Sequence, residues 1–156
     1  MKMAYVAALA LACASPILAQ AATSAPAVDL QYATPVAGDW VYARSATGGE
    51  SSFRDPSGRT QLTVRCTRAT RRVSIAKAAS GAAPFLSVWT SSLSRSIPAS
   101  FQPTTQQLVA DVGATDPVLD AMAFSRGRLG ISVTGQPAFV VPSWEELARV
   151  VEDCRT

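Results

Sequence analysis

The chain has 156 residues, with 14 basic and 11 acidic side chains, three cysteines and no histidine. A net charge of +3 is too small to indicate a nucleic-acid-binding protein, which usually shows a much stronger basic bias. Because histidine is the commonest general base and metal ligand, its absence argues against an ordinary hydrolase or a zinc enzyme. We therefore expect no cofactor and no bound metal.

Residues 1–21 read as a secretory signal peptide. Lys2 supplies the positive start, Ala4–Ala12 forms an apolar run, and Ala19-Gln20-Ala21 is a small-x-small cleavage site. No later stretch reaches the roughly 18 apolar residues of a membrane-spanning helix. The sequence therefore predicts a periplasmic or secreted protein with no transmembrane segment in its mature chain.

Cys13 provides an alternative to this processing. Leu11-Ala12-Cys13 resembles the end of a lipoprotein signal, in which the cysteine becomes lipidated. However, Ala10 stands where such signals usually have leucine, and the sequence continues to an ordinary cleavage site at Ala21. Lipidation of Cys13 stays the alternative, and it would anchor the protein to a membrane, weakly if one acyl chain were attached.

The segment after the signal, residues 22–37, is rich in Ala, Pro and Thr and is predicted to be a flexible lead-in. A short strand is expected within it at Leu30–Ala33. Residues 38–156 are predicted to form a single domain, whose first strand is Gly38–Arg44. The Gly/Ser/Pro-containing stretch Ser45–Arg59 is predicted to be a loop.

The next segment, Thr60–Cys66, alternates apolar and polar residues and places Leu62, Val64 and Cys66 on one face. Arg71–Ala76 follows after a turn and completes an antiparallel hairpin. The other expected strands are Phe85–Thr90, Ser94–Pro98, Gln107–Asp111, and a second hairpin of Arg128–Thr134 with Ala138–Val141.

Two helices are predicted from their first turns. Asp116 and Pro117 suit the N-cap and the first position of a helix. Ser143 and Glu146 form a capping box for a second helix, in which Leu147, Val150, Val151 and Cys154 share one face. The pattern therefore predicts an α+β fold with a mostly antiparallel sheet and two helices.

Two cysteines, Cys66 and Cys154, remain once the signal is removed. An even pair in an exported protein argues for one structural disulfide. Cys66 is expected to point inward from its strand and Cys154 to lie on the apolar face of the last helix. Their bridge would close a loop of about 88 residues and contribute roughly 4–5 kcal/mol to stability.

Three stretches carry a resemblance to known proteins: Leu62-Thr63-Val64-Arg65-Cys66, the run from Asp116 to Arg128, and the run from Pro142 to Arg155. In these the chain resembles small uncharacterised exported proteins of alphaproteobacteria. The order of elements is also similar to the VasI-type accessory proteins of type VI secretion and, more faintly, to the invasion-associated locus B proteins. The resemblance implies a cell-envelope protein and brings no catalytic residue with it.

Serine acyl-enzymes offer one catalytic interpretation, because Ser74-Ile75-Ala76-Lys77 matches their S-x-x-K motif. That chemistry needs the serine and lysine one helical turn apart. Here the motif lies on an expected strand, where residues three apart face opposite sides. We therefore expect no catalytic role for this pair.

Carboxylate pairs offer a second catalytic interpretation, since glycosidases use two carboxylates. The pairs sit at the starts of the two predicted helices, where caps and the helix dipole also account for them. These two pairs are Asp116 with Asp120 and Glu145 with Glu146, and a third pair, Glu152 with Asp153, lies later on the second helix.

Four arginines on the first hairpin, Arg65, Arg68, Arg71 and Arg72, are the candidate binding residues, and Arg126 and Arg128 are candidates to extend this set. Arg65 and Arg72 are expected close to opposite each other on the outer face, with the other two at the turn. Like charges across an antiparallel pair repel, and they favour an acidic neighbour or ligand. Arginine holds carboxylate and phosphate groups bidentately, which indicates an anion or a protein as partner.

The sequence thus predicts a non-enzymatic binding or accessory module of the cell envelope, for an envelope protein or an anionic envelope polymer. One alternative is a periplasmic enzyme inhibitor resembling lysozyme inhibitors, although the slightly basic chain does not suit a basic lysozyme. The other alternative is a small cell-wall enzyme that depends on carboxylates alone.

Overall fold

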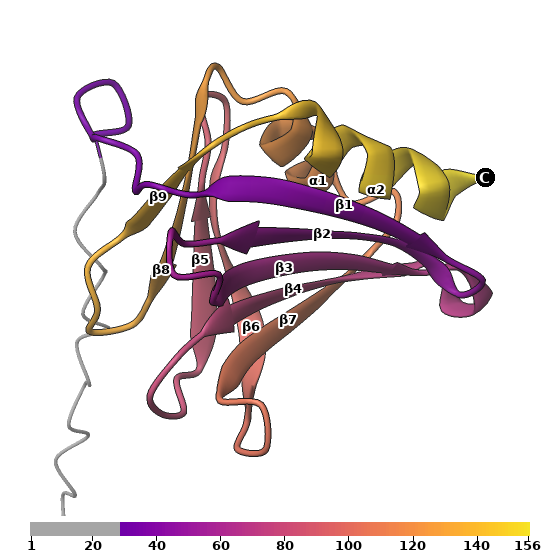
Figure 1. Ribbon diagram of the computed structural model, residues 1–156, viewed down its shortest axis with the longest axis horizontal. Helices are drawn as coiled ribbons and strands as arrows, with labels where there is room; N and C mark the ends of the chain where they lie inside the picture. The colour runs from indigo at the N-terminus through magenta and orange to yellow at the C-terminus, as the bar shows by residue number, and fades with distance from the viewer. Residues whose placement is uncertain (1–28) are drawn as a thin grey trace, which may run out of the picture.

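The computed structural model describes residues 29–156, so the expected signal peptide and Cys13 lie outside the described residues. The described residues form nine strands, two α-helices and one short 3-10 helix (Figure 1). In chain order they are β1 (Asp39–Ser45), β2 (Gly48–Arg54), β3 (Thr60–Thr67), η1 (Arg68–Thr70), β4 (Arg72–Ala78), β5 (Phe85–Trp89), β6 (Ser94–Gln102), β7 (Gln107–Gly113), α1 (Pro117–Ala123), β8 (Arg128–Val133), β9 (Phe139–Pro142) and α2 (Glu145–Arg155).

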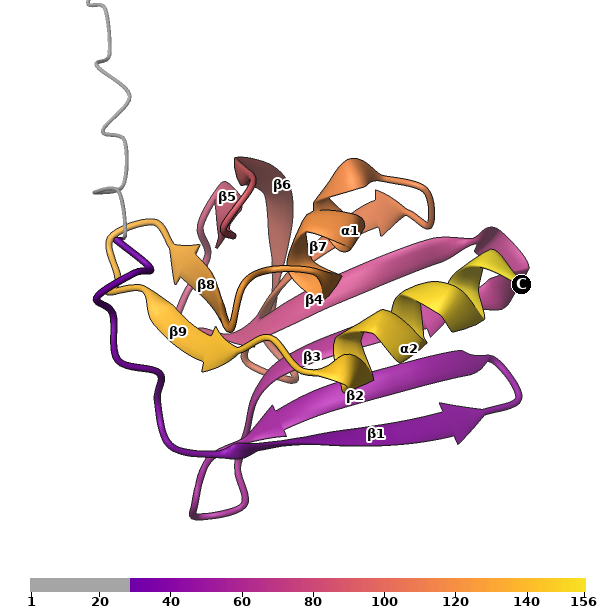
Figure 2. The ribbon, with the colours of Figure 1, turned by 90° about the horizontal axis from the view of Figure 1, so that it is seen from above.

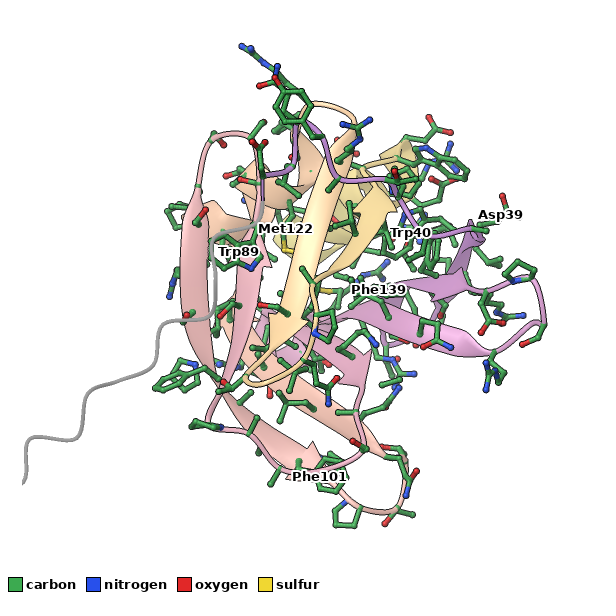
Figure 3. All side chains as sticks on the ribbon, turned by 90° about the vertical axis from the view of Figure 1, so that its left-hand side faces the viewer. Asp39, Trp40, Trp89, Phe101, Met122 and Phe139 are labelled. Atoms are coloured by element: carbon green, nitrogen blue, oxygen red, sulfur yellow. A yellow bond between two sulfur atoms is a disulfide. The ribbon has the colours of Figure 1, made fainter. Side chains whose placement is uncertain are left out.

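The strands make one sheet in the order β1-β2-β3-β4-β7-β6-β5-β8-β9. Every neighbouring pair is antiparallel. The sheet curls strongly, and the last strand comes back toward the first, where Trp40 Nε1 donates to the carbonyl oxygen of Pro142 at 2.8 Å. Figure 3 looks onto this junction, with Trp40 and Phe139 labelled. The predicted class, a mostly antiparallel α+β fold of one domain, is confirmed.

The core lies on the face of the sheet that carries Leu62, Val64 and Cys66, called the inner face below. The alternation of apolar residues in β3 continues across β4, because Val64 lies opposite Ile75 and Cys66 opposite Val73. Helix α2 lies across β2 and β3 on this face (Figure 2). Its buried residues are those of the predicted apolar stripe, Leu147, Val150, Val151 and Cys154.

The predicted disulfide is confirmed. Cys66 at the end of β3 is bonded to Cys154 in the last turn of α2, with 5.4 Å between their Cα atoms. Both residues are buried. The bridge fixes the helix to the inner face of the sheet at the end of the chain.

The predicted loop at Ser45–Arg59 is wrong, because it contains strand β2. The segment is poor in apolar residues, yet Ser51 and Ser52 are buried and only Phe53 is a large apolar side chain. Gly48 and Gly49 are buried as well, and a Cβ at Gly49 would overlap Asp153 Oδ2. Close packing against other elements thus requires small residues in this strand. A segment of small residues looks like a loop in the sequence, which is why the strand was not predicted.

The expected short strand at Leu30–Ala33 is also wrong. The chain turns there, and the carbonyl oxygen of Asp29 accepts the N–H groups of Tyr32 and Ala33. A few residues later, the N–H of Val36 donates to the carbonyl oxygen of Val140 in β9 at 2.8 Å. This part of the expected lead-in therefore contacts the outer edge of the last strand.

Strands β6 and β7 extend beyond the predicted ends at Pro98 and Asp111. The extension has a tertiary cause: β6 pairs with β7 up to Gln102 opposite Gln107, and the added end of β7 pairs with β4, where Gly113 lies opposite Arg72. Pro98 does not end the strand, because Phe85 pairs with it on the neighbouring strand.

The start of α1 is as predicted, since Asp116 is its N-cap and accepts the N–H of Val118 at 2.9 Å. The start of α2 differs: Trp144, not Ser143, is the N-cap, and no side chain caps the helix. Ser143 Oγ instead donates to the carbonyl oxygen of Met122 at 2.7 Å. A partner on α1 has replaced the local capping bond. Neither helix of the described part is long and apolar enough to cross a membrane.

Candidate functional site

The register of the first hairpin separates two of the predicted arginines. Arg72 lies opposite Thr67, whereas Arg65 lies opposite Ser74. The expectation that Arg65 and Arg72 lie across from each other is therefore wrong. The short 3-10 turn at the hairpin end shifts the pairing by two residues, and such a turn leaves no clear signal in the sequence.

Arg65 and Arg72 both have partners within the protein. Arg65 forms an ion pair with Glu50, which lies directly opposite it on β2. Arg72 Nη2 donates to the carbonyl oxygen of Asp111 on β7 at 3.0 Å. An acidic neighbour thus compensates the first charge, as one reading of the sequence expected.

Arg68 and Arg71 reach the C-terminal end of α2. Arg68 Nε donates to the carbonyl oxygen of Asp153 at 3.3 Å, and Arg71 Nη2 to that of Arg155 at 2.8 Å. The last carbonyl groups of a helix lack partners within it, and its C-terminus favours positive charge. These contacts give both arginines a structural role, and binding of an anion by the four-arginine set stays a prediction.

Of the four carboxylates in the two pairs at the helix starts, three form ion pairs. Glu146 forms none, and its Oε2 is buried without a hydrogen-bond partner in residues 29–156. Asp116 contacts Arg95 at 2.6 Å, Asp120 contacts Arg155 at 2.8 Å, and Glu145 contacts Arg149 at 2.9 Å. Within residues 29–156 no group of three or more metal-ligating side chains occurs.

A second pair of arginines, Arg126 and Arg128, lines a pocket of about 510 Å³ together with Leu30, Gln31 and Ser91, the Arg126 pocket below. Neither arginine forms an ion pair with a carboxylate of the described chain. Arg128 Nη1 donates to the carbonyl oxygen of Leu30 at 3.0 Å and also to that of Gln31. This guanidinium group is therefore fixed in place at the wall of the pocket.

Serine hydroxyls hold the loop that carries Arg126. The backbone N–H of Arg126 donates to Ser91 Oγ at 3.0 Å, and the N–H of Ser91 donates to Ser125 Oγ at 3.0 Å. Ser125 Oγ in turn donates to the carbonyl oxygen of Arg128. These bonds order the backbone and leave the exposed guanidinium group of Arg126 without a hydrogen-bond or ion-pair partner in residues 29–156. Such a group suits a carboxylate or phosphate oxygen.

The Arg126 pocket joins three distant stretches of chain, which contribute residues 30 and 31, residue 91, and residues 126 and 128. Arg126 and Arg128 stand out in the sequence only as a possible extension of the hairpin arginines. Nothing local indicates that Leu30, Gln31 and Ser91 lie beside them. No protein-family model, curated protein or solved structure matches the chain.

Proposed function

We propose that this chain is an exported, non-enzymatic binding module of the cell envelope whose partner is anionic. The observation that carries the proposal is the Arg126 pocket, in which two arginines without a carboxylate partner in the described residues line one cavity. Guanidinium groups hold carboxylates and phosphates through two parallel hydrogen bonds, and lipid A, teichoic-type polymers and peptidoglycan supply such groups in the envelope.

The envelope location is supported by two features. The N-terminal sequence resembles a secretory signal, and a disulfide persists in oxidising compartments such as the periplasm. The resemblance to exported alphaproteobacterial proteins agrees with it. We propose the periplasm or the extracellular medium, with a form tethered through Cys13 as the alternative.

The non-enzymatic part of the proposal rests on the chemistry of the chain. The sequence contains no histidine, and three of the four carboxylates at the helix starts, Asp116, Asp120 and Glu145, are bonded to arginines. A binding role needs neither. If the protein were an enzyme inhibitor, its anionic partner would be an acidic surface of the enzyme. This would be a special case of the proposed binding of an anionic partner.

The test is phosphate binding by the Arg126→Gln variant. Its backbone N–H still bonds Ser91 Oγ, so the loop should stay ordered. Arg149→Gln is the matched control, because Arg149 is exposed and paired with Glu145 away from the pocket. We expect inorganic phosphate to shift the amide NMR signals of residues 91 and 126–128, with at least about fivefold weaker affinity in Arg126→Gln and unchanged affinity in Arg149→Gln. No shift in the wild type, or equal affinity in both variants, would show the proposal to be wrong.

A further inference from the structure

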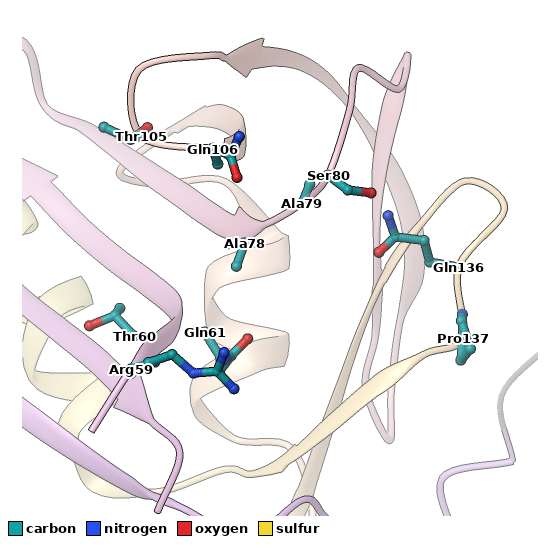
Figure 4. A pocket seen from close by; sticks show the side chains of 10 residues that line it. All are labelled: Arg59, Thr60, Gln61, Ala78, Ala79, Ser80, Thr105, Gln106, Gln136 and Pro137. Atoms are coloured by element: carbon teal, nitrogen blue, oxygen red, sulfur yellow. The ribbon is translucent and has the colours of Figure 1, made fainter. Parts of the chain in front are cut away.

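The two edges of the sheet are protected to different degrees. Strand β9, at one edge, has four residues and ends in Pro142, which has no N–H group to donate. The carbonyl oxygen of Pro142 accepts the indole N–H of Trp40, and that of Val140 accepts the N–H of Val36. The loop that leads into β9 lines a cavity of about 640 Å³ together with the ends of β3 and β4 (Figure 4). This edge therefore faces groups of its own chain.

Strand β1, at the other edge, lacks these protections. It has seven residues, contains no proline and pairs with β2 without a bulge. Its outer-face side chains Val41 and Ala43 are uncharged and exposed, and its only basic side chain, Arg44, contacts Asp153 of α2 at 3.3 Å. Natural sheets protect an edge because its unpaired N–H and C=O groups attract other strands. An edge without such protection indicates that another strand covers it.

The hairpin of β1 and β2 fixes which backbone groups of β1 point outward. Ser45 pairs with Gly48 across a two-residue turn, so these two residues exchange hydrogen bonds, and every second residue of β1 before Ser45 bonds β2 in the same way. The N–H and C=O groups of Trp40, Tyr42 and Arg44 therefore point away from β2. No other backbone group of residues 29–156 bonds them.

The outward groups of β1 are complementary to those of a second copy of the same strand. Tyr42 is the middle residue of Asp39–Ser45. A two-fold axis through Tyr42, perpendicular to the sheet, pairs the strand with its copy over its full length and in the antiparallel direction. Tyr42 then lies opposite Tyr42 of the copy, and Trp40 opposite Arg44. All the outward groups of both strands find partners in this register.

The side chains suit the same register. On the outer face Val41 lies opposite Ala43 of the copy on both sides of the axis, so two apolar pairs form, and no like charges lie directly opposite each other. Val41 is 44% exposed in the single chain. Helix α2 packs mainly on β2 and β3, and it leaves the outer side of β1 open (Figure 2).

We propose that β1 is a dimerisation edge, at which two copies of this chain join their sheets through antiparallel β1 strands centred on Tyr42. The partner is a second copy because the strand is complementary to itself over its whole length. A contact made by one pair of strands is smaller than a standard interface, so the dimer is weak and depends on concentration. This surface shares no residue with the Arg126 pocket.

The test compares the dimers of two variants that differ at one position. Both carry Ala43→Lys, which places the lysine opposite Glu50 within the hairpin and so suits the folded chain. Val41→Lys/Ala43→Lys puts lysine opposite lysine across the two-fold axis, whereas Val41→Glu/Ala43→Lys puts glutamate opposite lysine. By sedimentation equilibrium we expect the first variant to dimerise at least about tenfold more weakly than the second, because each difference occurs twice in the dimer.

Hydrogen exchange of the wild type tests the register without any substitution. The amides of Tyr42 and Arg44 point outward, whereas those of Val41 and Ala43 already bond β2. Raising the protein concentration should slow the exchange of the first two by at least about fivefold and leave the other two unchanged.

Three results would each overturn the proposal: a wild type that stays monomeric up to about 1 mM, equally strong dimers of the two double variants, or exchange at Tyr42 and Arg44 that does not change with concentration. Arg126→Gln should dimerise as the wild type does. The outcome for β1 is therefore independent of the outcome for phosphate binding.

Discussion

Trp40 on β1 donates its indole N–H to the carbonyl oxygen of Pro142 on β9, and this bond joins the first strand of the sheet to the last. The two residues are 102 positions apart in the chain. The Trp40 ring also meets Phe53 edge to face, and Phe53 meets Phe139 of β9 in the same way. These aromatic contacts close the curled sheet over its core where no strand pairing connects its two edges.

Replacing Trp40 by phenylalanine should therefore destabilise the fold. The variant loses the bond to Pro142 and part of a buried ring, which together contribute about 2–3 kcal/mol to the free energy of unfolding. Urea-induced unfolding measures this loss. Trp144→Phe is the control, because Trp144 is 43% exposed and its change should stay within about 0.5 kcal/mol. Equal effects of the two substitutions would contradict the role assigned to Trp40.

Reducing the disulfide should lower the urea midpoint strongly. Cys66 and Cys154 are 88 residues apart, and the constraint that their bond places on the unfolded chain amounts to roughly 4–5 kcal/mol. The measurement compares unfolding with and without reductant. The Cys66→Ala/Cys154→Ala variant should be insensitive to reductant, and a wild type with the same midpoint in both conditions would refute the prediction.

Gly49 and Gly113 make a matched pair of glycines within strands. A methyl group at Gly49 would overlap the carboxylate of Asp153, which also bonds Tyr42, whereas nothing lies within 4 Å of the corresponding position at Gly113. We expect Gly49→Ala to lower the free energy of unfolding by about 1–3 kcal/mol. Gly113→Ala should be neutral or stabilising by up to about 1 kcal/mol. Thermal unfolding of both variants checks the contrast, and a neutral Gly49→Ala would speak against the close packing of β2 on α2.

The pH dependence of stability should report the burial of Lys77. Its pKa is lowered in the folded protein from 10.5, so between the two values the unfolded chain binds more protons than the native one. The free energy of unfolding of the wild type should therefore rise with pH in this window, relative to Lys77→Met. The raised pKa of Tyr42 affects both proteins and cancels in the comparison. Parallel curves from pH 7 to 10.5 would show that Lys77 titrates as an exposed lysine.

The processing of the N-terminus is tested by the intact mass of the exported protein, before and after reduction and alkylation. We expect a chain that begins at Ala22 and takes up alkylating agent only after reduction. A lipidated N-terminal Cys13 would instead identify the tethered form. Free thiols without reduction would contradict the disulfide.

The helices were predictable because their signals are local. Asp116 caps α1 through an N–H two residues away, and the apolar stripe of α2 repeats with the period of the helix itself. The alternation in β3 is equally local, and with Cys66 on the inner face it was enough to predict the partner of Cys154. The fold class and the disulfide followed from these few periodic segments.

Strand β2 and the Arg126 pocket were not predictable from the sequence, because their residues are selected by distant neighbours. Gly49 must be small to fit against Asp153, and Ser51 is buried because its hydroxyl donates to the carbonyl oxygen of Glu146 on α2. Arg126 lies beside Ser91 only once β5 and β8 have paired. The pattern of residues along a segment indicates the local secondary structure of that segment. It does not indicate which other segment will pack against it.

The sequence by itself thus determined the class of fold, the pairing of Cys66 with Cys154 and the expectation of export, each from composition or from a period along one segment. Only the tertiary structure decided which cations are engaged and which are available. Arg65, Arg68 and Arg71 have partners supplied by β2 and α2, whereas Arg126 lines a pocket and has no carboxylate partner in the described chain. The physical reason is that the availability of a charge depends on the groups within a few ångströms of it, and the curling of the sheet brings those groups from distant parts of the chain.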